Sequence, residues 1–300
     1  MNENIDLLMT EQNNPCTRQI DQCGIRQILD LINREDQTVP LAVAREIDFI
    51  TDAVEGLVAC LKRGGRLIYI GAGTSGRLGI LDASECIPTF GTPPEMVTGI
   101  IAGGEQAIIH AVEGAEDDAR QAVLDIAAKE VCGDDAVVGV TASGRTPYVL
   151  AALQEANERG AFTVGVCNNK NSALSKVAKV TVEAETGPEV VMGSTRMKAG
   201  TAQKLILNML STCTMIKMGK VYSNYMVDLC ATNQKLYARS TRMIRILTDV
   251  DEKTARDALE KANGRLKVAI LMLKGGVSCE KAAQLLEEND DVLRLALEML

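Results

Sequence analysis

Short runs of β-branched and other apolar residues alternate along the chain with alanine-rich stretches of helical periodicity. The apolar runs predict five strands, at residues 66–71, 96–101, 136–141, 161–167 and 179–185. The stretches between them repeat apolar residues every three or four positions, which predicts helices at 77–86, 105–130 and 146–160. Continuous apolar strands separated by helices are typical of a parallel sheet covered on both faces. The pattern therefore predicts an α/β fold with a five-stranded parallel sheet flanked by helices.

Longer helical stretches precede and follow the predicted sheet. Residues 40–63 are amphipathic, with Pro40 at the start and two glycines directly after the end, as is common at helix boundaries. We expect further long helices at 194–219 and 227–247, and three short helical segments within 251–300. The expected parts are an N-terminal helical arm over residues 1–54, the sheet domain with its following long helices over 55–248, and a small all-helical C-terminal domain over 249–300.

Composition and charge limit the kinds of partner. The 300 residues are 46% hydrophobic, which is enough for a large core, and they carry a formal net charge of -8. Nucleic acids and anionic membranes favour a basic surface, because neutralisation of phosphate charge supplies much of the affinity. We therefore expect neither as a partner. Any anion must be held locally by backbone amides, hydroxyls and a few cations.

The cysteine and histidine content argues against a metal centre. Nine cysteines are scattered without a C-x-x-C pair, and His110 is the single histidine. This pattern signals neither a zinc site nor a disulfide framework, and it fits a reducing compartment. The N-terminal stretch MNENIDLLMT lacks the basic start of a signal peptide, and the most apolar stretch, LILNMLSTCTMI, is too short and too polar to span a bilayer. We expect a cytoplasmic protein.

A glycine-rich turn follows the first predicted strand, in the stretch IYIGAGTSGR. Gly71, Gly73 and Gly76 have the G-x-G-x-x-G spacing of dinucleotide-binding loops. Such a site also needs an acidic residue at the end of the next strand, about 20 residues further on, to bind the ribose. Glu105 comes too late for this role, and Asp82 comes too early, within the intervening helix. The context therefore does not favour a dinucleotide.

Three hydroxyl-rich turns stand where predicted strands end and helices begin. Backbone N–H groups and the positive end of the helix dipole bind phosphate at such positions, and hydroxyls add neutral donors. Any one of these residues could instead be an ordinary helix cap. Because three such turns occur together and two share Ser-Gly-Arg, we expect a phosphate cradle for a phosphorylated sugar. Its candidate residues are Gly73, Thr74, Ser75, Gly76, Ser143, Gly144, Thr146, Ser194 and Thr195.

The motifs GAGTSGR and TASGRTP, each between a strand and a helix, resemble the sugar isomerase (SIS) fold. Longer stretches, including GAGTSGRLGILDASECIPTFG and GPEVVMGSTRMKAGTAQK, resemble the bacterial N-acetylmuramic acid 6-phosphate etherases over nearly the whole chain. Eukaryotic glucokinase regulatory proteins are similar in part, but they are much longer and contain two such domains. A 300-residue chain with one copy fits the etherase family. The resemblance implies an SIS-type sheet and a homodimer whose sites are completed across subunits.

The resemblance also implies a substrate and a reaction. The substrate is an amino sugar with a D-lactyl ether at C3 and a phosphate at C6. In the open-chain sugar the C1 aldehyde acidifies the C2 proton, so lactate can leave C3 by elimination and water can add back. This route needs one base and one acid with different pKa values, but neither a metal nor another cofactor. By resemblance, Glu85 is the proton donor to departing lactate and Glu116 is the second acid/base residue, acting at C2.

Two other functions would use the same cradle. A sugar-phosphate aldose–ketose isomerase needs a base at C2 but no strong acid directed at C3. A non-catalytic sugar-phosphate-binding regulator needs neither glutamate, and a glutamate taken alone is more often a solvated surface residue. Glu113 is three residues from Glu116 and could share its helix face, and His110 precedes both on the same predicted helix. Lys198 and Arg196 are candidate cations for phosphate or the lactyl carboxylate.

Overall fold

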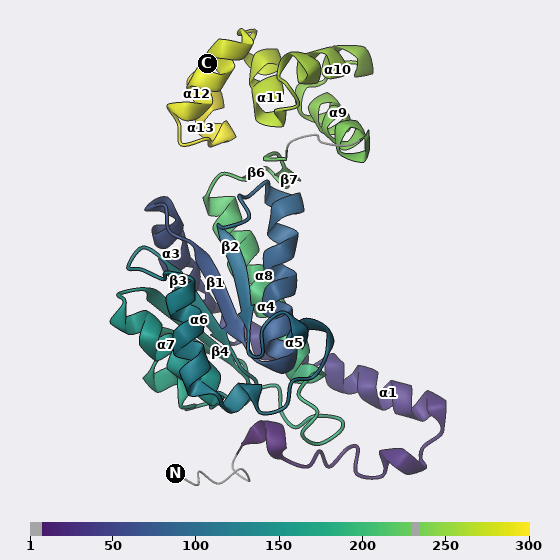
Figure 1. Cartoon of the computed structure of the whole chain (residues 1–300). Coiled ribbons are helices and arrows are strands. Elements are labelled where there is room, and N and C mark those ends of the chain that lie inside the picture. Colours follow the sequence, from purple (N-terminus) through teal and green to yellow (C-terminus); the bar gives the residue numbers. More distant parts are fainter. Residues whose placement is uncertain (1–7, 230–233) are drawn as a thin grey trace. The chain divides into compact units, whose positions relative to one another are not determined.

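The computed structural model describes residues 8–229 and 234–300, and Figure 1 shows its elements. Five parallel strands form the central sheet in the order β2-β1-β3-β4-β5. Their bounds are Leu67–Gly71 (β1), Val97–Ile101 (β2), Ala136–Val140 (β3), Phe162–Cys167 (β4) and Val180–Glu183 (β5). The predicted sheet is confirmed, and each strand lies inside its expected range, because strands buried on both faces carry continuous apolar runs.

Helices cover both faces of this sheet. Helices α6 (Ala119–Ala128) and α7 (Pro147–Glu158) pack on one face, where their apolar side chains form a core with Ile68 and Val137. The other face is covered by α3, α4 and α8. Their bounds are Ile47–Lys62 (α3), Gly73–Phe90 (α4) and Lys198–Lys217 (α8). The sheet is thus buried on both sides, as its strand sequences require.

A buried carboxylate links three elements on that second face. Asp82 of α4 accepts hydrogen bonds from the Tyr69 hydroxyl of β1 (2.8 Å) and from Asn208 Nδ2 of α8 (2.6 Å). Ser211 of α8 donates a third, at 3.2 Å. Burial raises the pKa of the Asp82 carboxyl, and the three hydrogen bonds oppose that effect. Asp82 therefore joins α4 to the sheet and to α8, and its buried side chain is engaged within the protein.

The prediction of one continuous helix over residues 40–63 is wrong. The structure has two helices there, α2 (Val39–Ala44) and α3, because the chain leaves the helical conformation at Glu46, with φ -103° and ψ 8°. Glu46 is buried, and its carboxylate accepts hydrogen bonds from Lys170 Nζ (2.5 Å) and the Glu183 amide (3.3 Å). These tertiary contacts hold the break, which hydrophobic periodicity does not reveal.

Two more predicted helices differ from the structure. The stretch 105–130 contains α5 (Gln106–Ile109), a 3₁₀ turn (Ala115–Asp117) and α6, separated by Gly114 with φ +73°. Glu113 and Glu116 therefore do not share a helix face, and that expectation was wrong. The helix expected from residue 194 begins four residues later, at the start of α8. A carboxylate bound to its first amides, described below, explains this later start.

The chain divides into two compact units. The first contains Met1–Ser84 and Pro94–Thr212, including the sheet and helix α1 (Ile25–Asp36). The second contains Glu85–Pro93 and Cys213–Leu300. The C-terminal turns of α4 thus belong to the second unit. The domain boundary expected at residue 249 falls inside that unit.

Among its described residues, the part of the second unit after α8 contains a short hairpin and five consecutive helices. Glycines 264 and 276 separate helices as expected, and a further break at residues 288–292 gives one helix more than the three segments predicted. The hairpin strands are Val221–Tyr222 (β6) and Tyr225–Met226 (β7). The helices are Gln234–Thr248 (α9), Glu252–Lys261 (α10), Leu266–Gly275 (α11), Cys279–Glu287 (α12) and Leu293–Glu298 (α13). Residues 230–233 of the helix expected over 227–247 lie outside the described residues. Within residues 8–229 and 234–300, no helix is long and apolar enough to cross a membrane.

A buried ion pair fixes the start of the β1–β3 pairing. Arg66 contacts the Asp135 carboxylate through Nη2 (2.7 Å) and Nε (3.0 Å), and the carboxylate also accepts from the amides of Arg66 (2.9 Å) and Cys132 (3.1 Å). Asp135 is 1% exposed. Burial by itself raises the pKa of this carboxyl, but the hydrogen bonds from Arg66 and Cys132 outweigh it and hold the pKa below its usual value.

Replacing Asp135 by Asn keeps the shape of the side chain but removes its charge. We expect D135N to lower the free energy of unfolding by about 2–4 kcal/mol at neutral pH, measured by urea denaturation. Because the folded pKa is lowered, the contribution of Asp135 is present above the ordinary Asp pKa of about 4 and is lost as pH falls through the folded value. The difference between the two proteins should shrink in that acidic range. A difference independent of pH would contradict this assignment.

Candidate functional site

The first hydroxyl-rich turn joins β1 to α4 at the carboxyl edge of the sheet. Gly73 has φ +52°, and a β-carbon at Gly71 would lie 2.8 Å from the Gly76 nitrogen, so the turn is too tight for a side chain there. Gly73 is exposed and Thr74 is half-buried. N–H groups in the first turn of a helix have no partner within the helix, and the helix dipole is positive there. The start of α4 therefore has the geometry of an anion site.

Ser75 has an internal partner. Its hydroxyl is buried and donates to Gln203 Oε1 of α8 at 2.8 Å. Gln203 Nε2 in turn donates to Asn168 Oδ1 (3.0 Å), and Asn168 Nδ2 donates to the Ala184 carbonyl (3.0 Å). A serine hydroxyl has one proton, and here that proton is bound to Gln203. Ser75 thus ties the first turn to α8 and to the loop that follows β4.

The second turn, after β3, lies beside the first because β1 and β3 are neighbours. The hydroxyls of Thr141 and Thr146 are 2.7 Å apart, and the Arg145 amide donates to Ser143 Oγ at 3.3 Å. Gly144 has φ +71°, and a β-carbon there would lie 2.5 Å from Ser172 Cβ. Thr146 occupies the N-cap position of α7 without a side-chain capping bond. Its hydroxyl therefore serves the loop and not the helix.

The third segment, Ser194 and Thr195, is half-buried and reaches the first turn through α8. A β-carbon at Gly200 of α8 would lie 3.5 Å from Thr74 Cγ2 and 3.6 Å from the Thr195 carbonyl oxygen. This proximity brings the first and third hydroxyl-rich segments together. All three candidate segments therefore gather at one edge of the sheet, as the parallel topology predicts.

The N-terminus of α8 already holds a carboxylate. Glu189 is 1% exposed, and its two oxygens accept the amides of Lys198 and Ala199, each at 2.9 Å. Burial raises the pKa of this carboxyl, and the two amide bonds and the Lys198 charge oppose the rise. Because Glu189 occupies these amides, the positive end of α8 is not open to a ligand. The sequence motif GPE, five residues before Ser194, gave no such indication.

Lys198 is also engaged within the first unit. Its side chain is 2% exposed, and Nζ lies 2.7 Å from Glu35 Oε2 of α1. The expectation that Lys198 is a cation for a ligand is therefore not supported in this conformation, in which Glu35 neutralises it. Arg196 is exposed.

The N-terminal segment crosses this edge of the sheet, which the sequence did not predict. Asn169, two residues after the end of β4, accepts a hydrogen bond from the Met9 amide (2.8 Å) and donates to Thr10 Oγ1 (3.1 Å) and to the Ala142 carbonyl (3.0 Å). Further along, the Thr17 hydroxyl donates to the Val190 carbonyl at 2.9 Å. The polar run CNNKNS after the fourth predicted strand was the available signal for such contacts.

The two candidate catalytic glutamates are both exposed, and they belong to different units. Glu85 lies on α4, about three turns beyond Gly73. Glu116 lies in the 3₁₀ turn Ala115–Asp117, between α5 and α6. His110 was expected within the same helix as Glu113 and Glu116, but it is an exposed residue in extended conformation at the end of α5.

Arg77 holds the segment that leads to Glu116. Its Nε donates to the Ile108 carbonyl (2.9 Å) and its Nη2 donates to the His110 carbonyl (3.3 Å). Arg77 is the arginine of the first Ser-Gly-Arg motif, where a basic residue suggests a phosphate ligand. The structure gives it a different contact, with the C-terminal end of α5.

Comparison with known proteins identifies the family. The glucokinase regulatory protein N-terminal SIS domain matches residues 49–157, the SIS domain matches 108–213, and the C-terminal lid domain of glucokinase regulatory protein matches 223–268. An N-acetylmuramic acid 6-phosphate etherase from Oceanobacillus iheyensis is 55% identical over 97% of this chain and 99% of its own. The chain belongs to the N-acetylmuramic acid 6-phosphate etherase family.

Other members of the etherase family match over similar lengths. The etherase of a Geobacillus species is 51% identical over 98% of this chain and 100% of its own, and that of Histophilus somni is 50% identical over 97% and 96%. A phosphoheptose isomerase from Francisella tularensis has a TM-score of 0.49 and 20% identity over 64% of this chain and 97% of its own. The etherase relatives confirm the family resemblance stated from the motifs, and the match to the SIS domain confirms the SIS-type fold.

The Arg77 contacts predict a local change in dynamics in this etherase-family chain. Arg77→Met removes two hydrogen bonds from a charged donor, each worth about 1.5–3 kcal/mol, so the 107–117 segment should open more often. We expect its amide hydrogen exchange to accelerate at least about tenfold, measured by mass spectrometry. Arg120→Met, at an exposed position on α6, is the matched control. Unchanged exchange in 107–117 would show that Arg77 does not hold this segment.

Proposed function

We propose that the protein cleaves the D-lactyl ether of N-acetylmuramic acid 6-phosphate and releases D-lactate and N-acetylglucosamine 6-phosphate. The observation that carries this proposal is 55% identity with a named etherase over 97% of the chain. At that identity and coverage the two chains share one fold over nearly their whole lengths. The activity is that of a carbon–oxygen lyase in amino-sugar catabolism and cell-wall recycling.

The lactyl ether oxygen is a poor leaving group, so the reaction needs both a base at C2 and an acid at the ether oxygen. Ring opening exposes the C1 aldehyde, which makes the C2 proton acidic. A base removes that proton, and an acid protonates the ether oxygen as lactate departs from C3. Water then adds to the unsaturated aldehyde at C3. Each of these proton transfers is a task for a positioned carboxyl group.

We assign these tasks by the family resemblance. Glu85 donates the proton to lactate, and Glu116 removes the C2 proton. Both side chains are exposed and thus accessible to a substrate. Arg77 binds the carbonyls of Ile108 and His110, in the segment that leads to Glu116.

The sugar phosphate binds at the carboxyl edge in this proposal. Gly73 and Thr74 offer first-turn amides and a hydroxyl at the start of α4, and Ser143, Gly144 and Thr146 stand on the neighbouring strand. Ser75 and Gly76 shape the first turn, through Gln203 and the tight approach to Gly71. Ser194 and Thr195 complete the cradle from the segment before α8. Phosphate charge is met by backbone and hydroxyl donors, as suits an acidic protein.

The other two functions have less support. A sugar-phosphate isomerase and a non-catalytic regulator would share the cradle. The matches to glucokinase regulatory protein domains span parts of the chain, whereas the named etherases match over 97–98% of it. A cytoplasmic location stays a prediction from the sequence.

We further propose that the protein is a homodimer whose sites are completed across subunits. Helices α1 to α3 of the first unit leave large apolar side chains in solvent, including Ile25 (80% exposed), Leu41 (65%) and Phe49 (48%). Exposed apolar side chains on adjoining helices are typical of a protein interface.

The function is tested by lactate release from purified N-acetylmuramic acid 6-phosphate. Wild-type protein should release one D-lactate per N-acetylglucosamine 6-phosphate. Glu85→Gln keeps the size of the side chain but cannot donate the proton, so we expect kcat to fall at least about 100-fold. The kcat of Glu116→Gln should fall by a similar factor, whereas the kcat of Glu113→Gln should stay within about twofold of the wild-type value. Saturable sugar-phosphate binding without lactate release by the wild type would leave the regulator as the better account.

The dimer is tested by light scattering after size-exclusion chromatography. Two negative charges at Leu41 and Phe49 should disrupt an interface there, so the L41D/F49D variant should elute as a monomer. Leu295→Asp, a 44% exposed leucine in the second unit, is the matched control and should stay dimeric. A monomeric wild type, or a variant as dimeric as the control, would overturn this proposal.

A further inference from the structure

The end of α4 is anchored inside the second unit. Gly91, which follows Phe90, adopts φ +62°, and its amide donates to the Ile87 carbonyl at 3.0 Å, so it closes the helix in the left-handed conformation. A β-carbon at Gly91 would lie 2.1 Å from the Asp228 carbonyl oxygen. No other residue type fits there without displacing the backbone at Asp228. The C-terminal turn of α4 and the chain after β7 are therefore in direct backbone contact.

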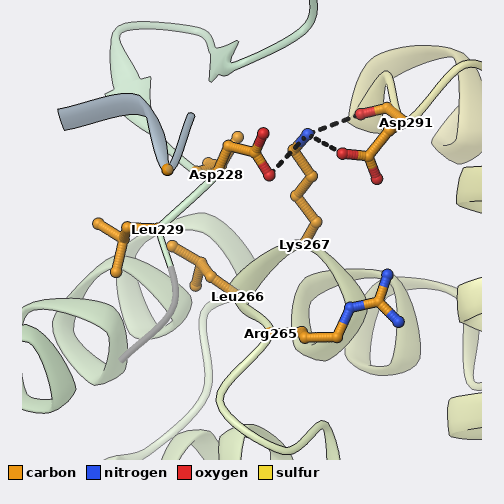
Figure 2. Close-up of a pocket in the computed structure, with 8 residues that line it drawn as sticks. Asp228, Leu229, Arg265, Leu266, Lys267 and Asp291 are labelled. Carbon is orange, nitrogen blue, oxygen red and sulfur yellow. Dashed lines mark hydrogen bonds and ion pairs between the residues drawn. The ribbon is translucent and has the colours of Figure 1, made fainter. Parts of the chain in front are cut away.

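Asp228 is itself fixed by two lysines. Lys220 binds one of its carboxylate oxygens, and Lys267 Nζ lies 3.1 Å from the other. Lys267 also donates to Asp291 through Oδ2 (2.8 Å) and the carbonyl (2.7 Å). Figure 2 shows the Lys267 ammonium group between the two aspartates, at a cavity of about 220 Å³ that Gly91 also lines. All three protons of this ammonium group are thus in use.

Lys267, at the centre of this cluster, is buried, Asp228 and Lys220 are partly buried, and the Asp291 side chain is 47% exposed. Lys267 is 4% exposed, and the side chains of Asp228 and Lys220 are 19% and 17% exposed. Two lysines and two aspartates balance their charge, so the cluster has no unpaired charge to offer a ligand. Ion pairs shielded from water hold their geometry more firmly than exposed ones. Through Lys267 of α11, the cluster therefore fixes the position of Asp228 relative to that helix. Asp228 in turn fixes the position of Gly91.

The end of α4 depends on such an anchor because of Pro88. Proline has no N–H group, so the Ser84 carbonyl loses its donor within the helix, one residue before Glu85. The helix itself therefore fixes the turn that carries Glu85 less firmly than it fixes earlier turns. The division between the two compact units falls at the same place, between Ser84 and Glu85. Glu85 is thus fixed from its C-terminal side, by residues of the second unit.

We propose that Gly91, Asp228 and Lys267 are positioning residues for Glu85. Their contact sets the direction of the last turns of α4 and, through them, the place of the Glu85 carboxyl. This inference rests on the proposed function, in which Glu85 protonates the departing lactate. The second unit would then supply the proton donor from the end of α4, and it would fix that donor through Asp228 and Lys267.

Two glycines of the second unit provide a matched test. Gly91 and Gly276 have nearly the same φ, +62° and +60°, and both follow a helix end, but a β-carbon at Gly276 meets nothing within 4 Å. Alanine at either position causes the same backbone strain, and only Gly91→Ala also displaces Asp228. We expect Gly91→Ala to lower kcat at least about tenfold with KM within about twofold, because the phosphate cradle belongs to the first unit. Gly276→Ala should keep both values within about twofold.

A second readout separates positioning from a loss of folding. In D₂O, Glu116 should still exchange the C2 proton of the substrate in Gly91→Ala, while lactate release falls, because Glu116 belongs to the first unit. Equal loss of proton exchange and lactate release in Gly91→Ala, or a kcat like that of Gly276→Ala, would overturn the inference.

If Gly91→Ala does not fold, Lys267→Met tests the same contact, with exposed Lys281→Met as its control. Glu85→Gln is measured in parallel. If it retains activity the assignment of Glu85 fails, whereas if it is inactive and Gly91→Ala is normal, only the positioning role fails.

Discussion

The parallel direction of all five strands is the constraint on which the rest of the structure depends. Every strand delivers its carboxyl end to the same edge, so the loops that follow β1, β3 and β4 are neighbours although they lie far apart in the sequence. Asn168 and Asn169, after β4, then link these loops to α8 and to the N-terminal segment. The proposed phosphate cradle is held by these internal hydrogen bonds, so it should lose little conformational freedom when a ligand binds.

A carboxylate of the protein itself limits which helix starts at this edge can bind an anion. Glu189 binds the first amides of α8, so the positive end of that helix is already neutralised. Helix α4 starts with glycine, threonine and serine, and Thr146 before α7 makes no side-chain capping bond. In our account the phosphate therefore binds at the starts of α4 and α7. Helix α8 contacts the start of α4 through Gln203, which binds Ser75, and through Gly200, which lies close to Thr74.

The sequence predicted the sheet well because strands buried on both faces leave little choice of residue type. It also located the hydroxyl-rich turns, since glycines and small polar residues must stand where a strand turns directly into a helix. It failed where a single tertiary contact overrides local pattern. The break at Glu46 depends on Lys170, more than a hundred residues away, and the late start of α8 depends on Glu189. Periodicity alone contains neither contact.

The candidate catalytic residues show the same limit. Glu85 and Glu116 were assigned by resemblance and are ordinary exposed glutamates by every local measure. Arg77 stands in the first Ser-Gly-Arg motif, and its guanidinium group binds the backbone carbonyls of residues 108 and 110, a contact that the motif does not indicate. The direction of a long side chain depends on its neighbours in space, which a motif does not specify. Residue type alone therefore did not predict the role of Arg77.

The central claim is that lactate leaves by cleavage of the bond between C3 and oxygen, followed by addition of water to the sugar. The most direct test is reaction of N-acetylmuramic acid 6-phosphate in H₂¹⁸O with mass spectrometry of both products. Elimination and hydration predict one ¹⁸O atom at C3 of N-acetylglucosamine 6-phosphate and none from the cleavage in lactate. Label in the hydroxyl group of lactate, with an unlabelled C3 hydroxyl, would mean that the other carbon–oxygen bond is cut and would contradict the account.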